Sequence, residues 1–486
     1  MAAMTDRQTP WPVPAPSVRR PPSVRRRSGA GTTGGPVRVR QWWRDAVGSL
    51  TWASVLIVVA LWVADGQLQV LGGWASGLTS LGRLTGLVSA DLLLIQVLLM
   101  SRIPIVERVY GQDELARRHR LVGFTSLNLM LAHIVLITLG YAAQDGKNPL
   151  IELWNLVVDY PGMLLALAGT GLLVMVAVTS IRKARKKLRY ESWHLLHLYA
   201  YLGVGLALPH QLWTGQEFLS HGFATVYWWS LWIAAAGSIL LWRVGAPVYR
   251  TLRYDLRVTA VVPESPDVVS VWMTGRDLHR LPVAAGQFFT WRFLSGPGWT
   301  RGHPYSLSAA PTGDTLRITV KDLGDDSRVL AGLRPGTRVA IEGPYGRLHA
   351  GVRTRRKVTL LASGIGVTPL RALLEELPQN AGDVTLIYRG RDERDLIFTE
   401  ELQQLAASRG ARLFYALGRR VPGRNSWLPE AAAHLSDAEA LRQLVPDVAN
   451  QDVYLCGAEG WMDAAKAAAL AAGVPAARIH EERFSW

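Results

Sequence analysis

The chain has 486 residues, of which 49% are hydrophobic, and 19 are tryptophan. This length suits about three domains, and the composition favours a membrane part joined to a water-soluble part. The formal net charge is +15, but no basic fold studded with aromatic residues accompanies it, so we expect no nucleic-acid partner. The single cysteine, Cys456, excludes an intrachain disulfide and a thiolate-held metal cluster.

Residues 1–42 are rich in proline, arginine, serine and glycine and contain no apolar core. This composition predicts a disordered basic tail. The tail is too long and too basic for a typical cleaved signal peptide. We therefore expect the first hydrophobic segment to be retained as an anchor.

Residues 43–248 are predicted to form a six-helix transmembrane bundle. The expected spans are Val47–Ala64, Leu84–Met100, Leu121–Tyr141, Pro161–Ile181, Trp193–Trp213 and Phe223–Trp242. The second span is short and carries Asp91 near its middle. A carboxyl at that depth must face the bundle, either in a hydrogen bond between helices or in a proton relay.

Basic residues concentrate in two of the predicted connections. The connection between spans two and three contains five arginines, and the connection between spans four and five contains six basic residues from Arg182 to Arg189. By the positive-inside rule, these two connections face the cytoplasm. We therefore expect a multi-pass protein of the cell membrane with both termini in the cytoplasm. Everything after the sixth span is then expected to be a cytoplasmic domain of about 240 residues.

The remaining sequence changes its pattern once. Residues 249–350 contain short alternating strands separated by Pro/Gly turns, which predicts an antiparallel β-barrel. In residues 351–486, apolar strands alternate with helical patterns, which predicts an α/β domain with a parallel sheet.

Four histidines fall at matched depths in the third and fifth spans. His119 and His133 are 14 residues apart, which is about 21 Å along a helix, and His197 and His210 are 13 apart. Because both helices run outward, His119 can face His197 and His133 can face His210, each pair holding one haem iron. The alternative is a set of interfacial or hydrogen-bonding histidines.

The 13-residue spacing is less regular than the other. On a straight helix it turns the second ring about 140° from the first. We therefore expect a bend near Pro209, aided by Gly203 and Gly205, or haems at different azimuths.

A flavin site is predicted in residues 249–350. His303-Pro304-Tyr305-Ser306 offers an aromatic face and a hydroxyl for a flavin ring. Val320 and Lys321 follow, and the small-residue turn that ends at Ser327 suits a pyrophosphate. The C-terminal Trp486 either covers the flavin ring or simply packs as an aromatic residue.

A nicotinamide nucleotide site is predicted in residues 351–486. The segment Gly364-Ile365-Gly366-Val367-Thr368 lies between a strand and a helix, where the glycines admit a phosphate and Thr368 can cap the helix. Arg389 and Arg391 end the next strand, where an adenosine 2′-phosphate would lie, so NADPH is modestly favoured over NADH. Cys456 and Gly457 end a later strand, and we expect Cys456 to line the site rather than act as a nucleophile.

Together these segments resemble the ferric reductase and NADPH oxidase superfamily, with a cytoplasmic part similar to ferredoxin–NADP reductases. The resemblance covers about residues 117–486 and also includes Gly343-Pro-Tyr-Gly346. It implies that the four histidines ligate two b-type haems, that His303–Ser306 holds FAD with Ser306 at the reacting ring, and that the glycine loop with Cys456-Gly457 holds NAD(P)H. Ala458 departs from the family, which often has proline there.

The predicted function is electron transfer from cytoplasmic NAD(P)H through FAD and two haems to a small-molecule acceptor across the membrane. A haem with two histidines has no open coordination position, so the acceptor can be a ferric chelate or dioxygen, which would give superoxide. The alternative is a membrane electron-donor subunit that serves a protein partner or a quinone. The sequence leaves the acceptor and the oligomeric state open.

Overall fold

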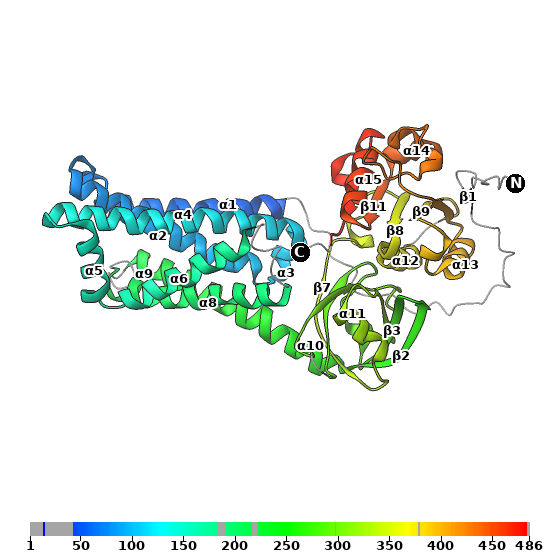
Figure 1. The fold of residues 1–486 in the computed structure, drawn as a ribbon, viewed down its shortest axis with the longest axis horizontal. Coiled ribbons are helices and arrows are strands. Elements are labelled where there is room, and N and C mark those ends of the chain that lie inside the picture. The colour runs from blue at the N-terminus through cyan, green and yellow to red at the C-terminus, as the bar shows by residue number, and fades with distance from the viewer. Residues whose placement is uncertain are drawn as a thin grey trace, which may run out of the picture. The chain divides into compact units, whose positions relative to one another are not determined.

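The structure, a computed structural model, describes residues 13–14, 42–181, 190–215, 222–296, 298–377 and 380–483. It contains two compact units (Figure 1). The helical unit comprises Arg40–Gly245, and the second unit contains Ala246–Trp486. The predicted domain limits at 42, 248 and 350 are not tested beyond this division and stay predictions.

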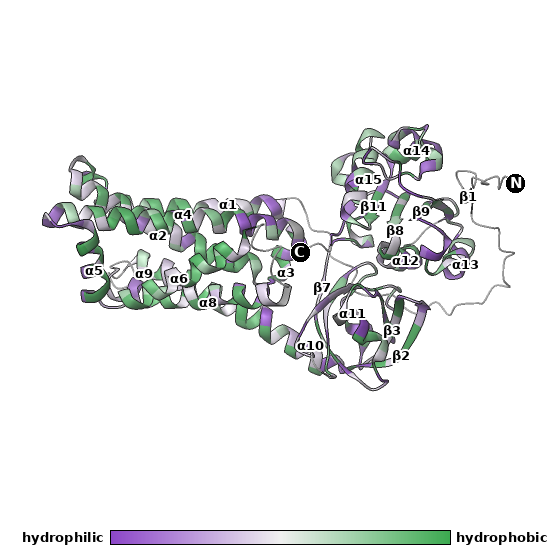
Figure 2. Cartoon of the chain, viewed as in Figure 1, coloured by the Kyte–Doolittle hydropathy of each residue, from purple (hydrophilic) through white to green (hydrophobic). Residues whose placement is uncertain are grey.

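The helical unit is built from long apolar helices. They are α1 (Trp42–Ala64), α2 (Trp74–Met100), α3 (Pro104–Tyr110), α4 (Gln112–Asp145), α5 (Pro149–Asp159), α6 (Met163–Ser180), α8 (Tyr190–Trp213) and α9 (Phe223–Ser238). Hydrophobic residues cover most of their length (Figure 2). Among the described residues, five helices are long and apolar enough to cross a membrane: α1, α2, most of α4, α6 and the helical stretch from Phe223 to Tyr254. The predicted fifth span is helix α8, which is not among the five, so the count of six spans stays a prediction.

Two features of this unit differ from the sequence-based expectation. The second helix, α2, has 27 residues and is not short. The additional helix α5 follows α4 and was not predicted; Asn148 caps its start by accepting a hydrogen bond from the backbone N–H of Leu150. Helix α5 has only 11 residues, too few to span a bilayer, so its sequence carries no transmembrane signal.

Asp91 joins three helices, as one of its two expected roles requires. The carboxyl is fully buried, and its Oδ1 accepts hydrogen bonds from Ser54 Oγ of α1 at 2.7 Å and from Tyr227 Oη of α9 at 2.6 Å. Hydroxyl donors offset the cost of removing this polar group from water. The interhelical hydrogen bond is therefore confirmed.

The second unit begins with α10 (Ala246–Tyr254) and then forms an antiparallel sheet, which we term the antiparallel domain. Its strands are β2 (Leu256–Ser265), β3 (Val268–Thr274), β4 (Phe288–Phe293), β5 (His303–Ser306), β6 (Thr315–Lys321) and β7 (Arg338–Tyr345), with the short helix α11 (Asp325–Arg328) after β6. They pair in the order β5-β4-β7-β2-β3-β6. An antiparallel bridge between Leu307 and Ile318 brings the two edge strands together. Closure into a full barrel stays a prediction.

The rest of the unit, the parallel domain, is a sheet covered by helices on both faces. Its elements are β8 (Val358–Ser363), α12 (Val367–Glu376), β9 (Val384–Gly390), α13 (Thr399–Arg409), β10 (Arg412–Leu417), α14 (Asp437–Leu444), β11 (Asp452–Cys456), α15 (Glu459–Ala471) and β12 (Ile479–Glu481). The order is β1-β10-β9-β8-β11-β12, all parallel except for the antiparallel edge strand β1 (Val13–Pro14). One core lies under α12 and α13, and the other lies under α14 and α15.

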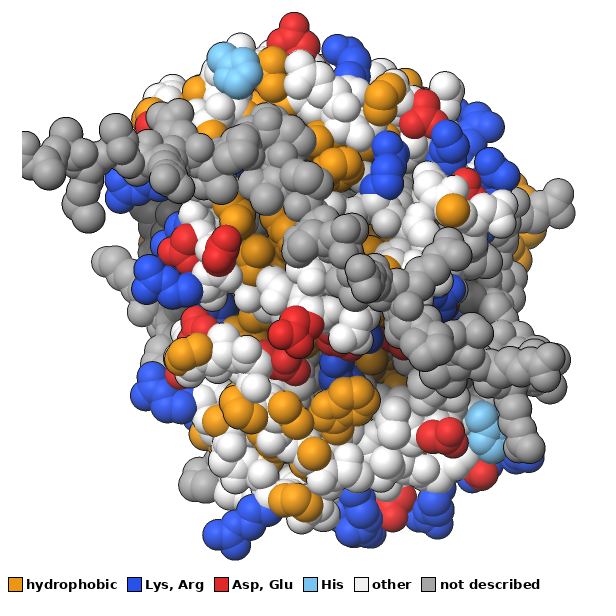
Figure 3. Space-filling model, turned by 90° about the vertical axis from the view of Figure 1, so that its right-hand side faces the viewer, with side chains coloured by type: hydrophobic (Ala, Val, Ile, Leu, Met, Phe, Trp, Pro, Cys, Tyr) orange, Lys and Arg blue, Asp and Glu red, His pale blue; other side chains and the backbone are white. Residues whose placement is uncertain are grey.

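Both sheets confirm the predicted change from antiparallel to parallel strands. The strands β7 and β12 were not predicted. Figure 3 shows one face of this unit, where Lys and Arg side chains and Asp and Glu side chains are interspersed. On the part of this face that the structure describes, positive charge is not gathered into one patch.

Candidate functional site

The four predicted histidines meet in two pairs, one on each half of α4 and α8. The ring centroids of His119 and His197 lie 5.8 Å apart, and those of His133 and His210 lie 6.4 Å apart. His194, the third histidine of α8, is not the partner of His119. His221 lies outside the described residues.

One ring nitrogen of each histidine already has a partner. His133 Nδ1 lies 2.7 Å from the carbonyl oxygen of Gly82, and His119 Nδ1 lies 3.4 Å from that of Gln96. A carbonyl oxygen can only accept, so Nδ1 is the donor in both rings. This arrangement leaves Nε2 as the nitrogen available to a metal, the usual division of roles in a ligating histidine.

The partner histidines on α8 are held by hydroxyl groups. His210 Nδ1 lies 2.7 Å from Thr214 Oγ1, whose own proton goes to the His210 carbonyl oxygen at 2.6 Å. His197 Nδ1 lies 3.3 Å from Ser180 Oγ, which also accepts a hydrogen bond from Trp193 Nε1. All four rings therefore have a fixed orientation.

The groups that orient these rings were not predicted from the sequence. Gly86 of α2 stands against the imidazole of His133, where a Cβ atom would lie 2.5 Å from Nδ1. Gly82 and Gly86 form a small-xxx-small pair, the spacing that lets two membrane helices approach closely. This spacing was the available signal. Pro209 lies inside α8, and both histidine pairs form despite the irregular 13-residue spacing.

The predicted flavin segment forms strand β5 at one edge of the antiparallel sheet. Ser306 is 7% exposed, and its buried Oγ has no hydrogen-bond partner among the described residues. The rings of His303 and Tyr305 lie 6.0 Å apart with an interplanar angle of 17°. A buried hydroxyl without a partner beside half-exposed rings fits an aromatic ligand with a hydrogen-bonding edge.

Three further predicted flavin contacts have different surroundings. The side chain of Val320 is packed in the core of the antiparallel domain, so any contact with a ligand must come from its main chain. Lys321 forms an ion pair with Asp267 at 3.1 Å and lines the pocket described below. Ser327 Oγ accepts from the backbone N–H of Leu323 and closes its own turn. Trp486 lies outside the described residues.

The predicted nucleotide loop forms a single 3-10 turn, Gly364–Gly366, before α12. Gly364 has φ +53°, and a Cβ atom there would meet nothing within 4 Å. A Cβ atom on Gly366 would lie 2.3 Å from the carbonyl oxygen of Cys456. Gly364 thus faces open space that a phosphate can enter, whereas Gly366 lets the loop pack directly on Cys456-Gly457.

Thr368 does not cap the helix, contrary to the expectation. Helix α12 begins at Val367, and the Thr368 hydroxyl donates to the carbonyl oxygen of Ile365 at 3.0 Å. A cap at Thr368 would place the first helical residue at Pro369. The helix begins two residues earlier because the glycine turn continues directly into it.

A pocket of about 260 Å³ opens beside this loop. Ser363, Gly364 and Ile365 line one side. Four arginines of the parallel domain, together with Lys321 of the antiparallel domain, make the lining basic: Arg389, Arg391, Arg394 and Arg420. Asp267 and Asp395 are the acidic residues of the lining. Such a lining suits a phosphorylated ligand.

The two predicted arginines have unequal roles. Arg389 is buried and donates to the carbonyl oxygens of Gly390, Ala416 and Gly418, so its guanidinium joins the ends of β9 and β10. Burial, and then the nearby Arg420, lower its pKa to about 10. Arg391 is exposed, and the hydrogen bond to Asp395 raises its pKa and keeps it charged. Arg391 therefore suits the predicted phosphate contact better than Arg389 does.

One region in each part of the chain matches a known protein family. The family described as "Ferric reductase like transmembrane component" matches residues 85–208, and the family described as "Oxidoreductase NAD-binding domain" matches residues 360–467. The first range contains three of the four paired histidines, and the second contains the glycine turn and Cys456. The chain joins a ferric reductase-like membrane domain to an NAD-binding reductase domain. Each part of the chain is therefore similar to a domain of an oxidoreductase family.

Known proteins with similar sequences match about half of this chain. It is 32% identical over 243 residues to the ferredoxin reductase component of 3-ketosteroid-9-alpha-monooxygenase from Mycobacterium tuberculosis, covering 47% of this chain and 65% of that protein. It is 30% identical over 239 residues to a flavohemoprotein from Candida norvegensis, covering 47% and 58%. The chain thus spans less than two thirds of these relatives. A solved FAD/NAD-binding domain of nitric oxide dioxygenase from Vibrio cholerae is 27% identical, with a TM-score of 0.39, and covers 47% of this chain and 98% of that one.

The surroundings of Cys456 predict an unreactive thiol. The side chain is 2% exposed, and burial, followed by the charge of Glu482, raises its pKa to about 12. The nucleophilic thiolate is therefore scarce at neutral pH. We expect iodoacetamide to label the folded protein at pH 7–8 at least about 100-fold more slowly than the denatured protein, as measured by mass spectrometry. Equal labelling rates would contradict this environment.

Proposed function

We propose that this protein carries electrons from NAD(P)H, through FAD and two b-type haems, to an acceptor on the opposite side of the membrane. The observation that carries the proposal is the presence of two facing histidine pairs along α4 and α8 in a chain that also contains a basic nucleotide pocket.

The histidine pairs support haem binding through their spacing. Metal–imidazole bonds of about 2 Å on both sides of an iron place two ring centres about 6 Å apart. The observed separations of 5.8 Å and 6.4 Å fit this arrangement. His119 with His197 would hold one haem, and His133 with His210 would hold the other. Each haem held by such a pair would supply one-electron chemistry.

The antiparallel domain is proposed to hold FAD. Ser306 supplies a hydroxyl that lacks a protein partner among the described residues, and Tyr305 supplies an aromatic face. FAD held there would supply the conversion of an electron pair from the nicotinamide into single electrons, which haem requires.

The nucleotide pocket is proposed to hold NAD(P)H, with a preference for NADPH. Gly364 admits the pyrophosphate, and the exposed Arg391 with Arg394 and Arg420 supplies positive charge for a 2′-phosphate. The Cys456 thiol is packed in the core of the parallel domain and is not part of the pocket lining, so any contact of this residue with the nicotinamide would come from its main chain.

The direction of transfer follows from the proposed membrane orientation. If the basic connections face the cytoplasm, both termini lie on the cytoplasmic side of the cell membrane. A negative interior then favours outward movement of an electron by about 2.3 kcal/mol per 100 mV for a full crossing. Two histidines would ligate each iron, so the proposed acceptor is one that can be reduced without binding iron, a ferric chelate or dioxygen.

Replacement of one outer histidine tests the haem assignment. We expect His133→Ala and His210→Ala to give the same result: one haem per chain instead of two, continued flavin reduction by NADPH, and loss of acceptor reduction. Haem content is measured from the pyridine haemochrome spectrum, and flavin reduction is measured from its absorbance under anaerobic conditions.

His194→Ala is the matched control, because this residue lies on the same helix outside both pairs. It should retain two haems. Full haem content in His133→Ala would remove the assignment.

A second prediction concerns the choice of nucleotide. Arg391→Gln and Arg420→Gln should each raise the KM for NADPH by about ten-fold, because a charge-assisted hydrogen bond contributes about 1.5–3 kcal/mol. The KM for NADH should change by less than about two-fold. Arg355→Gln, an exposed arginine of the parallel domain outside the pocket, is the control. Equal effects on both nucleotides would contradict a 2′-phosphate contact.

A second candidate function is an electron-donor subunit for a protein partner or a quinone. The relatives named as ferredoxin reductase components favour testing it. Purified protein supplied with NADPH is compared with ferric chelate, dioxygen and quinone as acceptors. Rapid turnover with a ferric chelate or dioxygen supports the first function. Negligible turnover with both, together with a stable co-purifying partner, supports the second.

A further inference from the structure

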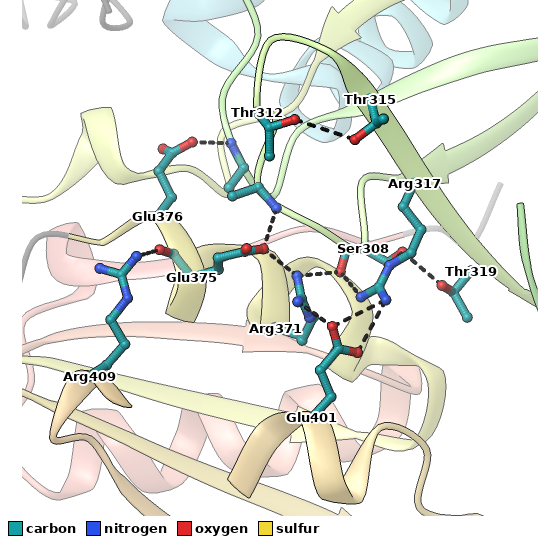
Figure 4. Close-up of polar contacts among 12 residues, drawn as sticks. Ser308, Thr312, Thr315, Arg317, Thr319, Arg371, Glu375, Glu376, Glu401 and Arg409 are labelled. Carbon is teal, nitrogen blue, oxygen red and sulfur yellow. Dashed lines mark hydrogen bonds and ion pairs between the residues drawn. The ribbon is translucent and has the colours of Figure 1, made fainter. Parts of the chain in front are cut away.

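Two buried arginines cross the boundary between the antiparallel and parallel domains (Figure 4). Arg317 extends from β6 of the antiparallel domain, and Arg371 extends from α12 of the parallel domain. Each is 4% exposed. A buried charge destabilises a protein strongly unless it is paired and hydrogen-bonded, so the partners of these side chains are informative.

Arg317 is held by residues of both domains. Its NH1 group donates to both carboxylate oxygens of Glu401 in α13, at 3.2 and 3.1 Å. Its guanidinium carbon lies 5.1 Å from the ring centre of Trp272 and 4.7 Å from that of Phe398. Trp272 belongs to the antiparallel domain and Phe398 to the parallel domain, so the guanidinium stacks on a ring from each.

Arg371 makes the reciprocal crossing. Its NH1 group donates to the carbonyl oxygen of Ser308 in the antiparallel domain at 3.2 Å, and its NH2 group donates to Glu401. The same Ser308 carbonyl accepts from Arg317 NH2 at 2.7 Å. Glu401 and the Ser308 carbonyl therefore each bind both arginines.

Helix α12 adds two further links to the antiparallel domain. The carboxylate of Glu375 accepts from the backbone N–H of Ala310 at 2.9 Å, and that of Glu376 accepts from the N–H of Ala285 at 2.8 Å. Burial, and then the neighbouring Arg371, lower the pKa of Arg317, whereas Glu401 opposes this change. Glu401 and Glu375 balance the two arginines in charge.

This network connects the two candidate binding sites along the chain. Strand β5 ends at Ser306, the proposed flavin contact, and Ser308 lies two residues further along the chain. Arg371 lies in the second turn of α12, the helix that begins at the glycine turn of the nucleotide loop. A shift of α12 therefore acts directly on the segment that carries Ser306.

We propose that Arg317, Arg371 and Glu401 are positioning residues that set the distance between the nicotinamide and the flavin for hydride transfer. This role rests on the proposed function. In the step, the C4–H bond of the nicotinamide breaks, the hydrogen moves with two electrons to form an N–H bond at flavin N5, and NADPH becomes NADP⁺. None of the three residues lines the nucleotide pocket. They act because a misplacement of about 1 Å costs about 100-fold in rate.

The test measures flavin reduction by NADPH in the purified full chain under anaerobic conditions. Glu401→Gln leaves two buried arginines facing each other without their shared carboxylate. We expect the limiting rate of flavin reduction per bound FAD to fall by about ten-fold or more. FAD content and the NADPH concentration for half-saturation should remain within about two-fold. The long-wavelength charge-transfer absorbance between nicotinamide and flavin should weaken.

Arg317→Lys is the second variant and keeps the charge. Lysine lacks the planar fork and the stacking surface of arginine, so a smaller fall in the limiting rate is expected. This variant decides the outcome if Glu401→Gln fails to retain FAD. Asp447→Asn is the matched control because it removes a half-exposed ion pair with Lys357 inside the parallel domain.

The outcomes separate the alternatives. A lower limiting rate in both variants, with the control at the wild-type rate, supports the proposal. An unchanged rate per bound flavin overturns it, including when FAD content or thermal stability falls, because that result shows a purely structural role. If NADPH and NADH fail to reduce the flavin of the wild-type chain, the proposed function itself fails.

Discussion

A histidine inside an apolar helical bundle has two ring nitrogens to satisfy, and much of the helical unit follows from how this chain satisfies them. The Nδ1 atoms of His119 and His133 are bound to carbonyl oxygens of α2, and those of His197 and His210 are bound to hydroxyl groups. The bonds of His119 and His133 join α4 to α2. In all four rings, Nε2 is the nitrogen left available to a metal. Close packing of α2 on α4 is required, which explains why small residues such as Gly86 stand opposite the rings.

The second unit solves a different problem, because its two ligands belong to two sheets. The flavin segment lies at the edge of an antiparallel sheet, and the nucleotide loop follows the first strand of a parallel sheet. In the proposed function, their relative placement sets the distance between the nicotinamide and the flavin. Arg317 and Arg371, which share Glu401 and the Ser308 carbonyl, are proposed to fix that placement; both arginines are buried, whereas Glu401 is partly exposed. Burial makes these bonds directional and costly to break.

The two units therefore use polar groups in the same way. In each, a buried polar side chain joins elements that apolar packing alone would leave free to slide. Asp91 joins α1, α2 and α9 through Ser54 and Tyr227, and the buried Arg317 and Arg371 join the antiparallel and parallel domains through the partly exposed Glu401. Apolar contacts supply most of the burial energy but little direction. Hydrogen bonds to charged groups supply the direction that holds such elements in one register.

The sequence by itself determined the features that depend on periodicity and local spacing. The apolar runs, the histidine spacings in α4 and α8, the change from antiparallel to parallel strands and the glycine turn were all predictable, because each is written into neighbouring residues. The tertiary structure decided the partners. It assigned Arg389 to the carbonyl ends of β9 and β10, turned Thr368 into the helix rather than to its cap, added Arg394 and Arg420 to the pocket, and joined Arg317 to Glu401 across 84 residues. A side chain's partner depends on which distant segment packs against it, and no local pattern carries that information.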